Sequence, residues 1–240
     1  MRTQTIQFPD RKTLCIFPTE RSQLDEALTK LNLESGYPVI VLIGGAIDKL
    51  KASATLRAIQ TIAKLAHEKK ILLICGGTDM GVMAKIGQVR SQNAYTFPLI
   101  GITLEDLVSW PDGPQSTKFL WWGRDRWQLE PHYPYFILVP GDHFGDESPW
   151  INDAARIFSQ GKQSVTILIN GGEISRKDIQ FSLEEGRQVI ALSHTGRLAD
   201  EISQDFERNG LITVVSANMD EKIINVICSI LKIDQPHIEP

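Results

Sequence analysis

The stretch Ile71–Met83, with the sequence ILLICGGTDMGVM, most constrains the fold, because glycines here join a buried strand to a helix. It begins with an apolar run that does not alternate with polar residues, which is typical of a parallel strand buried on both faces. Gly76, Gly77 and Gly81 follow, and an apolar pattern with helical spacing comes next. Glycines let the backbone approach a ligand closely, and N–H groups at a helix start attract anions. The stretch is therefore typical of a phosphate-binding turn, although a tight turn alone can use the same residues.

The composition indicates a globular protein. The chain has 240 residues, of which 42% are hydrophobic, and a formal net charge of −4. This acidic balance argues against bulk nucleic-acid binding, which needs a basic surface. No apolar run approaches the roughly 20 residues of a membrane span, and the polar first ten residues carry no signal segment. We therefore expect a soluble cytoplasmic protein that contacts neither membrane nor nucleic acid.

The cysteines and histidines do not follow a metal-binding spacing. Cys15 and Cys75 lie in strand-like apolar runs, and Cys228 lies on the apolar side of a predicted helix. Buried free thiols explain these positions better than disulfides or metal ligands. We expect no metal site and no required cofactor.

Strands and helices are predicted to alternate along the chain. The apolar runs predict strands at 13–17, 38–43, 71–75, 98–103, 135–139, 165–169, 188–192 and 211–215. Helical spacing predicts helices at 21–33, 54–69, after residue 81, and at 151–160, 174–185, 198–208 and 220–231. This order is typical of the α/β class, with a Rossmann-like, doubly wound, mostly parallel sheet and helices on both faces. We expect a single domain over residues 1–240, interrupted by a Trp-rich insertion at about 104–134, where a functional lid is one interpretation.

Glycine turns recur at the predicted strand ends. Ligands of parallel sheets lie beyond the carboxyl ends of the strands, at the reversal of strand order, so these turns should meet at one crevice. The residues expected to bind a ligand there are Gly44, Gly45, Ala46, Gly76, Gly77, Thr78, Gly81, Val82, Met83, Gly171, Gly172, His194, Thr195, Gly196, Arg197 and Asp200.

Some of these residues have more than one interpretation. Thr78 either binds a phosphate through its hydroxyl and N–H or caps the following helix. Asp79 either caps that helix or meets a ribose hydroxyl. Arg197 either pairs bidentately with a pyrophosphate or forms an ion pair with Asp200, three residues later on the same helical face. His194 lies beside the last glycine turn and is placed to contact a ligand.

Two further groups complete the candidates. Glu147 follows the strand at 135–139 and either accepts ribose hydroxyls or serves as a general acid. The insertion contains Trp121, Trp122, Arg124 and Trp127, which either stack on a base or form a hydrophobic plug or a subunit contact.

The motifs together resemble the SLOG superfamily, and specifically the LSDAT branch found at the N-terminus of melastatin-type TRP channels and in prokaryotic relatives. The matching pieces keep the family's order from residue 38 to about 205. They are the segments 44–46 (GGA), 75–83 (CGGTDMGVM), 98–102 (PLIGI), 130–139 (EPHYPYFILV), 144–147 (FGDE), 170–172 (NGG) and 195–200 (TGRLAD).

The resemblance implies a Rossmann-like fold that recognises NAD-derived nucleotides such as ADP-ribose and its cyclic forms, as a sensor in stress or defence pathways. A sensor of this kind has no catalytic residue. A homo-oligomer and an effector protein acting in trans both remain open as partners. The alternative is a nucleotide phosphoribohydrolase or N-glycosidase of the LOG type, with Glu147 as the catalytic acid.

Two departures from the family pattern bear on this choice. LOG-type enzymes carry a Gly-Gly-x-Gly-Thr motif and a downstream glutamate, whereas this chain reads Gly-Gly-Glu-Ile-Ser-Arg at 171–176. The channel branch carries a His-Thr-His cluster, of which only His132 matches, and Tyr135 takes the place of the second histidine. The first departure favours the sensor. A third alternative, single-stranded DNA binding as in the DprA branch, conflicts with the acidic charge.

Overall fold

The computed structural model describes residues 1–116, 125–204 and 210–235. The main sheet contains β1 (Arg2–Phe8), β2 (Arg11–Phe17), β3 (Val39–Gly44), β4 (Leu72–Cys75), β5 (Leu99–Leu104), β8 (Tyr135–Val139), β9 (Ser164–Ile169), β10 (Gln188–Ser193) and β11 (Ile212–Ser216). The helices are α1 (Leu24–Lys30), α2 (Ala52–Lys69), α3 (Gly81–Gln92), α4 (Ser148–Ser159), α5 (Glu173–Glu184), α6 (Arg197–Gln204) and α7 (Asp220–Leu231).

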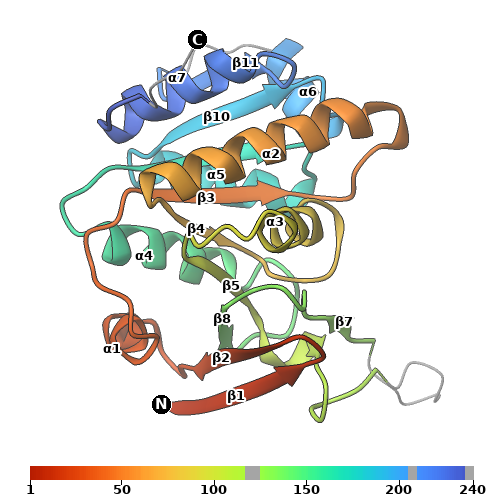
Figure 1. Cartoon of the computed structure of the whole chain (residues 1–240), viewed down its shortest axis with the longest axis vertical. Coiled ribbons are helices and arrows are strands. Elements are labelled where there is room, and N and C mark those ends of the chain that lie inside the picture. The colour runs from red at the N-terminus through yellow and green to blue at the C-terminus, as the bar shows by residue number, and fades with distance from the viewer. Residues whose placement is uncertain (117–124, 205–209, 236–240) are drawn as a thin grey trace.

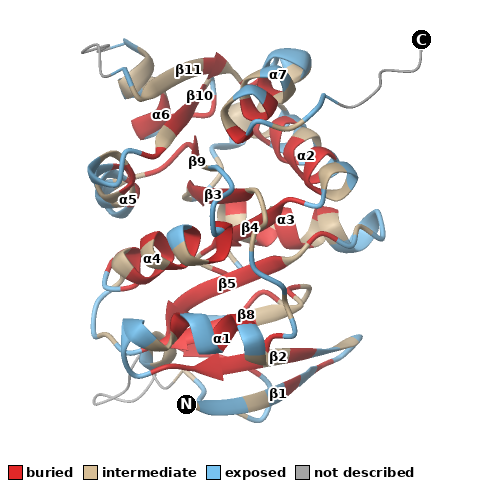
Figure 2. Ribbon diagram, turned by 90° about the vertical axis from the view of Figure 1, so that its left-hand side faces the viewer, coloured by how far each residue is buried: buried red, intermediate tan, exposed pale blue. Residues whose placement is uncertain are grey.

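The sheet has the order β1-β2-β8-β5-β4-β3-β9-β10-β11, from bottom to top in Figure 1 and in Figure 2, where β9 is labelled. Every neighbouring pair is parallel except β1 and β2, which form an antiparallel hairpin. The chain moves outward from β3 through β4, β5 and β8, and then returns to place β9 on the other side of β3. The predicted α/β fold with a doubly wound, mostly parallel sheet is confirmed, and strand order reverses between β3 and β9.

Helices cover both faces of the sheet because its inner strands are apolar on both sides. Side chains alternate along β3, so that Ile40 and Leu42 pack under α2, α3 and α7, while Val39, Val41 and Ile43 pack under α1, α4, α5 and α6. The helices turn their buried sides to the sheet and their exposed sides outward (Figure 2). This two-sided burial explains the apolar runs without alternation.

The N-terminal hairpin extends the sheet beyond the predicted elements, since no strand is predicted before residue 13. In β1 only Ile6 and Phe8 are buried, and the remaining side chains are half-buried or exposed. An edge strand with one solvated face has too few apolar residues for a strong sequence signal.

The described part of the Trp-rich insertion packs against the sheet. Its two short strands, β6 (Val108–Ser109) and β7 (Trp127–Gln128), pair with each other, and Trp110 is buried with its ring centroid 6.2 Å from that of Phe17. Trp121, Trp122 and Arg124 lie outside the described residues, so both interpretations of them, base stacking and a hydrophobic plug or subunit contact, stay predictions. Within the described ranges, none of the helices combines the length and apolar character needed to span a membrane.

Candidate functional site

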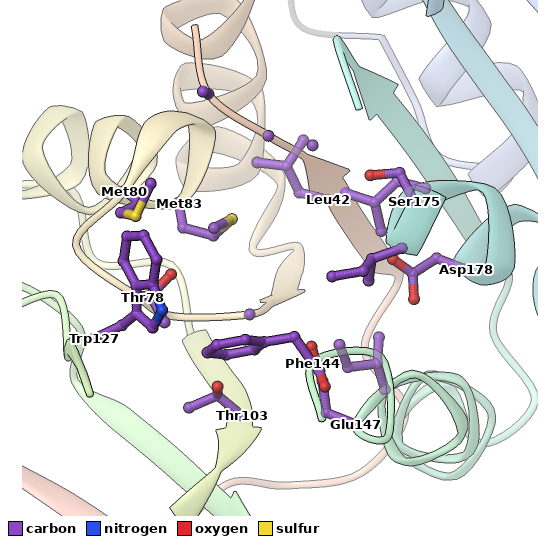
Figure 3. A pocket seen from close by; sticks show the side chains of 17 residues that line it. Leu42, Thr78, Met80, Met83, Thr103, Trp127, Phe144, Glu147, Ser175 and Asp178 are labelled. Atoms are coloured by element: carbon purple, nitrogen blue, oxygen red, sulfur yellow. The ribbon is translucent and has the colours of Figure 1, made fainter. Parts of the chain in front are cut away.

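A cavity of about 230 Å³ lies at the carboxyl ends of β3, β4 and β5, beside the reversal of strand order (Figure 3). One wall is formed by loops that follow the strands, and it contains six of the predicted binding residues. These are Gly44, Gly45, Ala46, Gly76, Thr78 and Met83. The opposite wall comes from α4, α5 and the loop that precedes α4.

The glycines around the cavity have two different roles. A β-carbon at Gly76 would meet only the Met83 Cγ, at 3.9 Å, so this glycine leaves open space on the cavity side. Gly77 has φ +72°, and a β-carbon there would lie 2.7 Å from the Gly101 Cα and 2.8 Å from the Phe136 ring. Gly77 is therefore required by packing against β5 and β8, and it does not line the cavity.

Gly81 and Val82 join two of the loops. A β-carbon at Gly81 would lie 2.1 Å from the Gly45 carbonyl oxygen, and the Val82 N–H donates to the same oxygen at 3.2 Å. One of the N–H groups at the start of α3 therefore donates to the β3 loop and is not available to a ligand. The N-cap residue of α3 is Met80, so Thr78 does not cap this helix. The Thr78 side chain instead lines the cavity.

The Arg197 guanidinium lies across the reversal of strand order. A β-carbon at Gly45 would be 3.4 Å from its Nη1, and one at Gly172 would be 2.6 Å from its Nη2. Among the residues that the structure describes, Arg197 has no ion-pair partner. Asp200 instead pairs with the Lys51 ammonium. The alternative of an Arg197–Asp200 ion pair is wrong, and the arginine presents an unpaired charge beside two glycines.

The loop from His194 to Gly196 is structural rather than part of the cavity wall. The buried Thr195 hydroxyl accepts the Asn170 N–H at 2.8 Å and donates to the Leu192 carbonyl at 2.7 Å. The Asp200 carboxylate accepts the His194 N–H at 2.6 Å, and the exposed imidazole lies 3.2 Å from the Ser193 hydroxyl. His194 and Asp200 therefore hold the loop that carries Arg197.

Asn170 contributes an acceptor that was not among the predicted binding residues. Its side-chain nitrogen donates to the Thr195 carbonyl oxygen at 3.0 Å, which fixes the amide orientation. Its Oδ1 is buried and has no hydrogen-bond partner in the described part of the chain. A β-carbon at Gly45 would lie 3.7 Å from this oxygen, so the unpaired acceptor lies close to Arg197.

Two carboxyl groups lie on the opposite wall, where Glu147 and Asp178 point into the cavity (Figure 3). Burial raises the pKa of Glu147, although the Gly145 N–H opposes this by donating to its Oε2 at 2.7 Å. Burial also raises the pKa of Asp178 to about 7; the Ser148 hydroxyl opposes the rise, and the Glu147 charge adds to it. The Asp178 Oδ1 is buried without a partner among the described residues. A carboxyl group half protonated near neutral pH can both donate and accept a hydrogen bond.

Arg197 and Asn170 do not line the cavity but adjoin it at Gly45, and much of the remaining lining is apolar. Met80, Met83, Trp127, Phe144 and Ile174 line this part, and the Trp127 and Phe144 rings meet edge to face at 6.5 Å. Trp127 is thus one aromatic candidate of the insertion that reaches the cavity. Asp178 and Ser175 were not predicted as site residues, because they lie at ordinary helical positions of α5. The signal that could have identified Asp178 is the downstream carboxylate expected of the LOG-type motif.

His132 lies away from the cavity, beside the buried Glu130. The two Glu130 carboxylate oxygens contact the His132 N–H at 2.8 Å and the Nδ1 at 2.5 Å. The Glu130 N–H donates to the Gly77 carbonyl oxygen at 3.0 Å. The His132 ring is thus oriented by the Glu130 carboxyl group, whose backbone N–H binds the glycine loop.

The fold defines a Rossmann-like protein, and its cavity lies at the topological switch point, where ligands of such sheets usually bind. The chain belongs to the family described as "SLOG in TRPM, prokaryote", whose sequence model matches residues 37–231. The resemblance found in the motifs is thereby confirmed.

Solved structures share the fold at low identity. The X-ray structure of TM1055, a structural-genomics target, is 20% identical with a TM-score of 0.55 and covers 80% of this chain and 99% of its own. The molybdenum cofactor carrier protein from Chlamydomonas reinhardtii is 14% identical with a TM-score of 0.51 and the same two coverages. No curated protein matches the sequence.

Substitution by alanine should change the free energy of unfolding by different amounts at the two adjacent glycines. Gly77→Ala should lower the free energy of unfolding by about 2 kcal/mol or more, because the methyl group meets β5 and the φ is left-handed. Gly76→Ala should change it by less than about 0.5 kcal/mol, since its methyl group points to open space. Chemical denaturation of both variants measures this difference. Equal destabilisation would contradict the roles assigned to the two glycines.

The raised pKa of Asp178 predicts a pH-dependent stability. The ordinary pKa is 3.8 and the folded value is about 7, so between these values the folded state binds more protons than the unfolded state. The free energy of unfolding should therefore fall as pH rises from about 4 to about 7. Asp178→Asn should flatten this slope in denaturation curves measured across that window, while the slope from Glu147 remains. An unchanged slope would show that the Asp178 pKa is not raised.

Proposed function

We propose that this protein is a cytoplasmic sensor that binds a nucleotide-derived ligand across the crevice between β3 and β9, with ADP-ribose-type molecules as the first candidates. The observation that carries the proposal is the unpaired Arg197 guanidinium, which lies against Gly45 and Gly172. A guanidinium fork matches phosphate oxygens bidentately, and glycines let those oxygens reach the backbone. A diphosphate at this position would neutralise the arginine.

The rest of the ligand follows from the chemistry of the cavity. In this proposal the unpaired Asn170 Oδ1, a buried acceptor next to Gly45, accepts a ribose hydroxyl. The apolar part, with Met83, Trp127 and Phe144, suits the faces of a base. Thr78 is placed to donate its hydroxyl to a phosphate. Membership of the SLOG family supports nucleotide recognition.

A nucleotide N-glycosidase or phosphoribohydrolase is the second candidate function, and Asp178 favours it. A general acid works best when its pKa lies near the operating pH, and the Asp178 pKa of about 7 meets this condition. Glu147 lies in the same cavity, so one carboxyl group could protonate a leaving base while the other stabilises positive charge on the ribose. The Gly-Gly-Glu-Ile-Ser-Arg sequence at 171–176 favours the sensor, because it lacks the LOG-type glycine and threonine.

Arg197→Ala tests the phosphate position. Its affinity for ADP-ribose in isothermal titration calorimetry should fall by at least about 1.5 kcal/mol, the lower range for a hydrogen bond to a charged group. Arg57→Ala is the matched control, because Arg57 is exposed and paired with Asp220. An Arg197→Ala variant that binds as tightly as the unmodified protein would contradict the proposal.

Product analysis separates the sensor from the enzyme. We expect ADP-ribose, its cyclic forms and AMP to remain intact by chromatography after hours with the protein, because a sensor only needs to bind. Accumulation of a free base that disappears in Asp178→Asn or Glu147→Gln would instead establish the enzyme. Binding measured on the same samples shows that an intact ligand was in contact with the cavity.

A further inference from the structure

A second cavity lies at the opposite edge of the sheet, where the parallel strands begin. Its volume is about 390 Å³, and it is enclosed by the β1–β2 hairpin, the end of α3 and the segment before β8. Its walls carry Arg11, Arg90 and His132 together with Phe8, Tyr95 and Asp10. None of its lining residues belongs to the glycine turns or to the apolar cavity at the other edge.

The two arginines are held in place by backbone carbonyls. Arg11 donates from Nη1 to the His132 carbonyl oxygen, and Arg90 donates from Nε to the Phe97 carbonyl oxygen at 2.8 Å. The Arg90 guanidinium also lies over the Phe97 ring, with Cζ 5.5 Å from its centroid. Both groups are therefore preorganised, and each keeps further N–H donors for a ligand.

No anion of the described protein neutralises this pair. Neither arginine forms an ion pair within residues 1–116, 125–204 and 210–235, and the buried Arg11 Nε finds no acceptor there. Asp10 is exposed in the hairpin turn, and the Glu130 carboxylate is occupied by His132. Burial lowers the pKa of Arg90 to about 10, and the nearby Arg11 charge lowers it further to a smaller extent.

We propose that this cavity is a second anion-binding site, in which Arg11 and Arg90 bind the phosphate group of a small phosphate monoester. Two like charges held together in a partly buried cavity are unfavourable unless an anion joins them. A phosphate monoester carries about −1.5 to −2 charges at neutral pH, which matches two guanidinium groups. Phe8 and Tyr95 provide apolar contact for its organic part. The site is independent of the function proposed for the crevice.

Calorimetric titration with phenyl phosphate and with inorganic phosphate tests the site on the full chain. We expect both to bind, with Arg11→Gln and Arg90→Gln each weakening binding at least about tenfold. Lys12→Gln removes the same charge from an exposed neighbour outside the cavity and should bind as the unmodified protein does. Absence of binding to the unmodified protein at millimolar phosphate would overturn the proposal.

A second pair of variants leaves the arginine contacts intact. Ala94 lines the cavity with φ +52°, a conformation that Asn and Asp tolerate better than most residues. Ala94→Asp should weaken phosphate binding at least about tenfold by charge repulsion, and Ala94→Asn should not. Equal affinity of these two variants would place the bound phosphate elsewhere, and the proposal would fail.

Discussion

The close approach of β3 and β9 is the contact on which the crevice depends. A β-carbon at Gly44 would lie 2.4 Å from the Ile169 carbonyl oxygen and 2.9 Å from the Val82 Cγ2, so β3 has to end in glycine. Beyond this contact the chain leaves toward α2 on one face of the sheet and toward α5 on the other. The two loops separate, and a ligand can enter between them. Arg197 spans this opening, because the hydrogen bonds of Thr195 fix the loop before it.

The positively charged group and the carboxyl groups of the crevice lie in different places. Arg197 lies at the reversal of strand order without an acidic partner in the described ranges, while Glu147 and Asp178 lie on the opposite wall with raised pKa values. Apolar side chains such as Phe144 line the same cavity as the two carboxyl groups. A ligand with an anionic end, a hydroxylated centre and a planar apolar end complements this arrangement, which is the description of a nucleotide. The Asp178 carboxyl group, with its raised pKa, lines the same cavity, so binding and cleavage need separate assays.

The sequence predicts the sheet well, because two-sided burial leaves apolar runs that need no tertiary context. It also predicts which loops meet, since parallel strands bring their carboxyl ends to one edge. It does not separate Gly76 from Gly77, because the packing of Gly77 on Gly101 and Phe136 arises only when β5 and β8 are adjacent. It does not identify Asp178 either, because a single polar residue on an amphipathic helix has the same sequence pattern whether its side chain faces solvent or a cavity. The β1 strand is not predicted from the sequence, because only two of its side chains are buried.

A crystal structure of the protein with bound ADP-ribose tests whether the ligand lies in the β3–β9 crevice. We expect diphosphate oxygens within hydrogen-bonding distance of the Arg197 guanidinium and beside Gly45, with adenine against Trp127 and Phe144. Ligand bound away from the β3–β9 crevice, or with its adenine against Arg197 and its phosphates in the apolar cavity, would contradict the account.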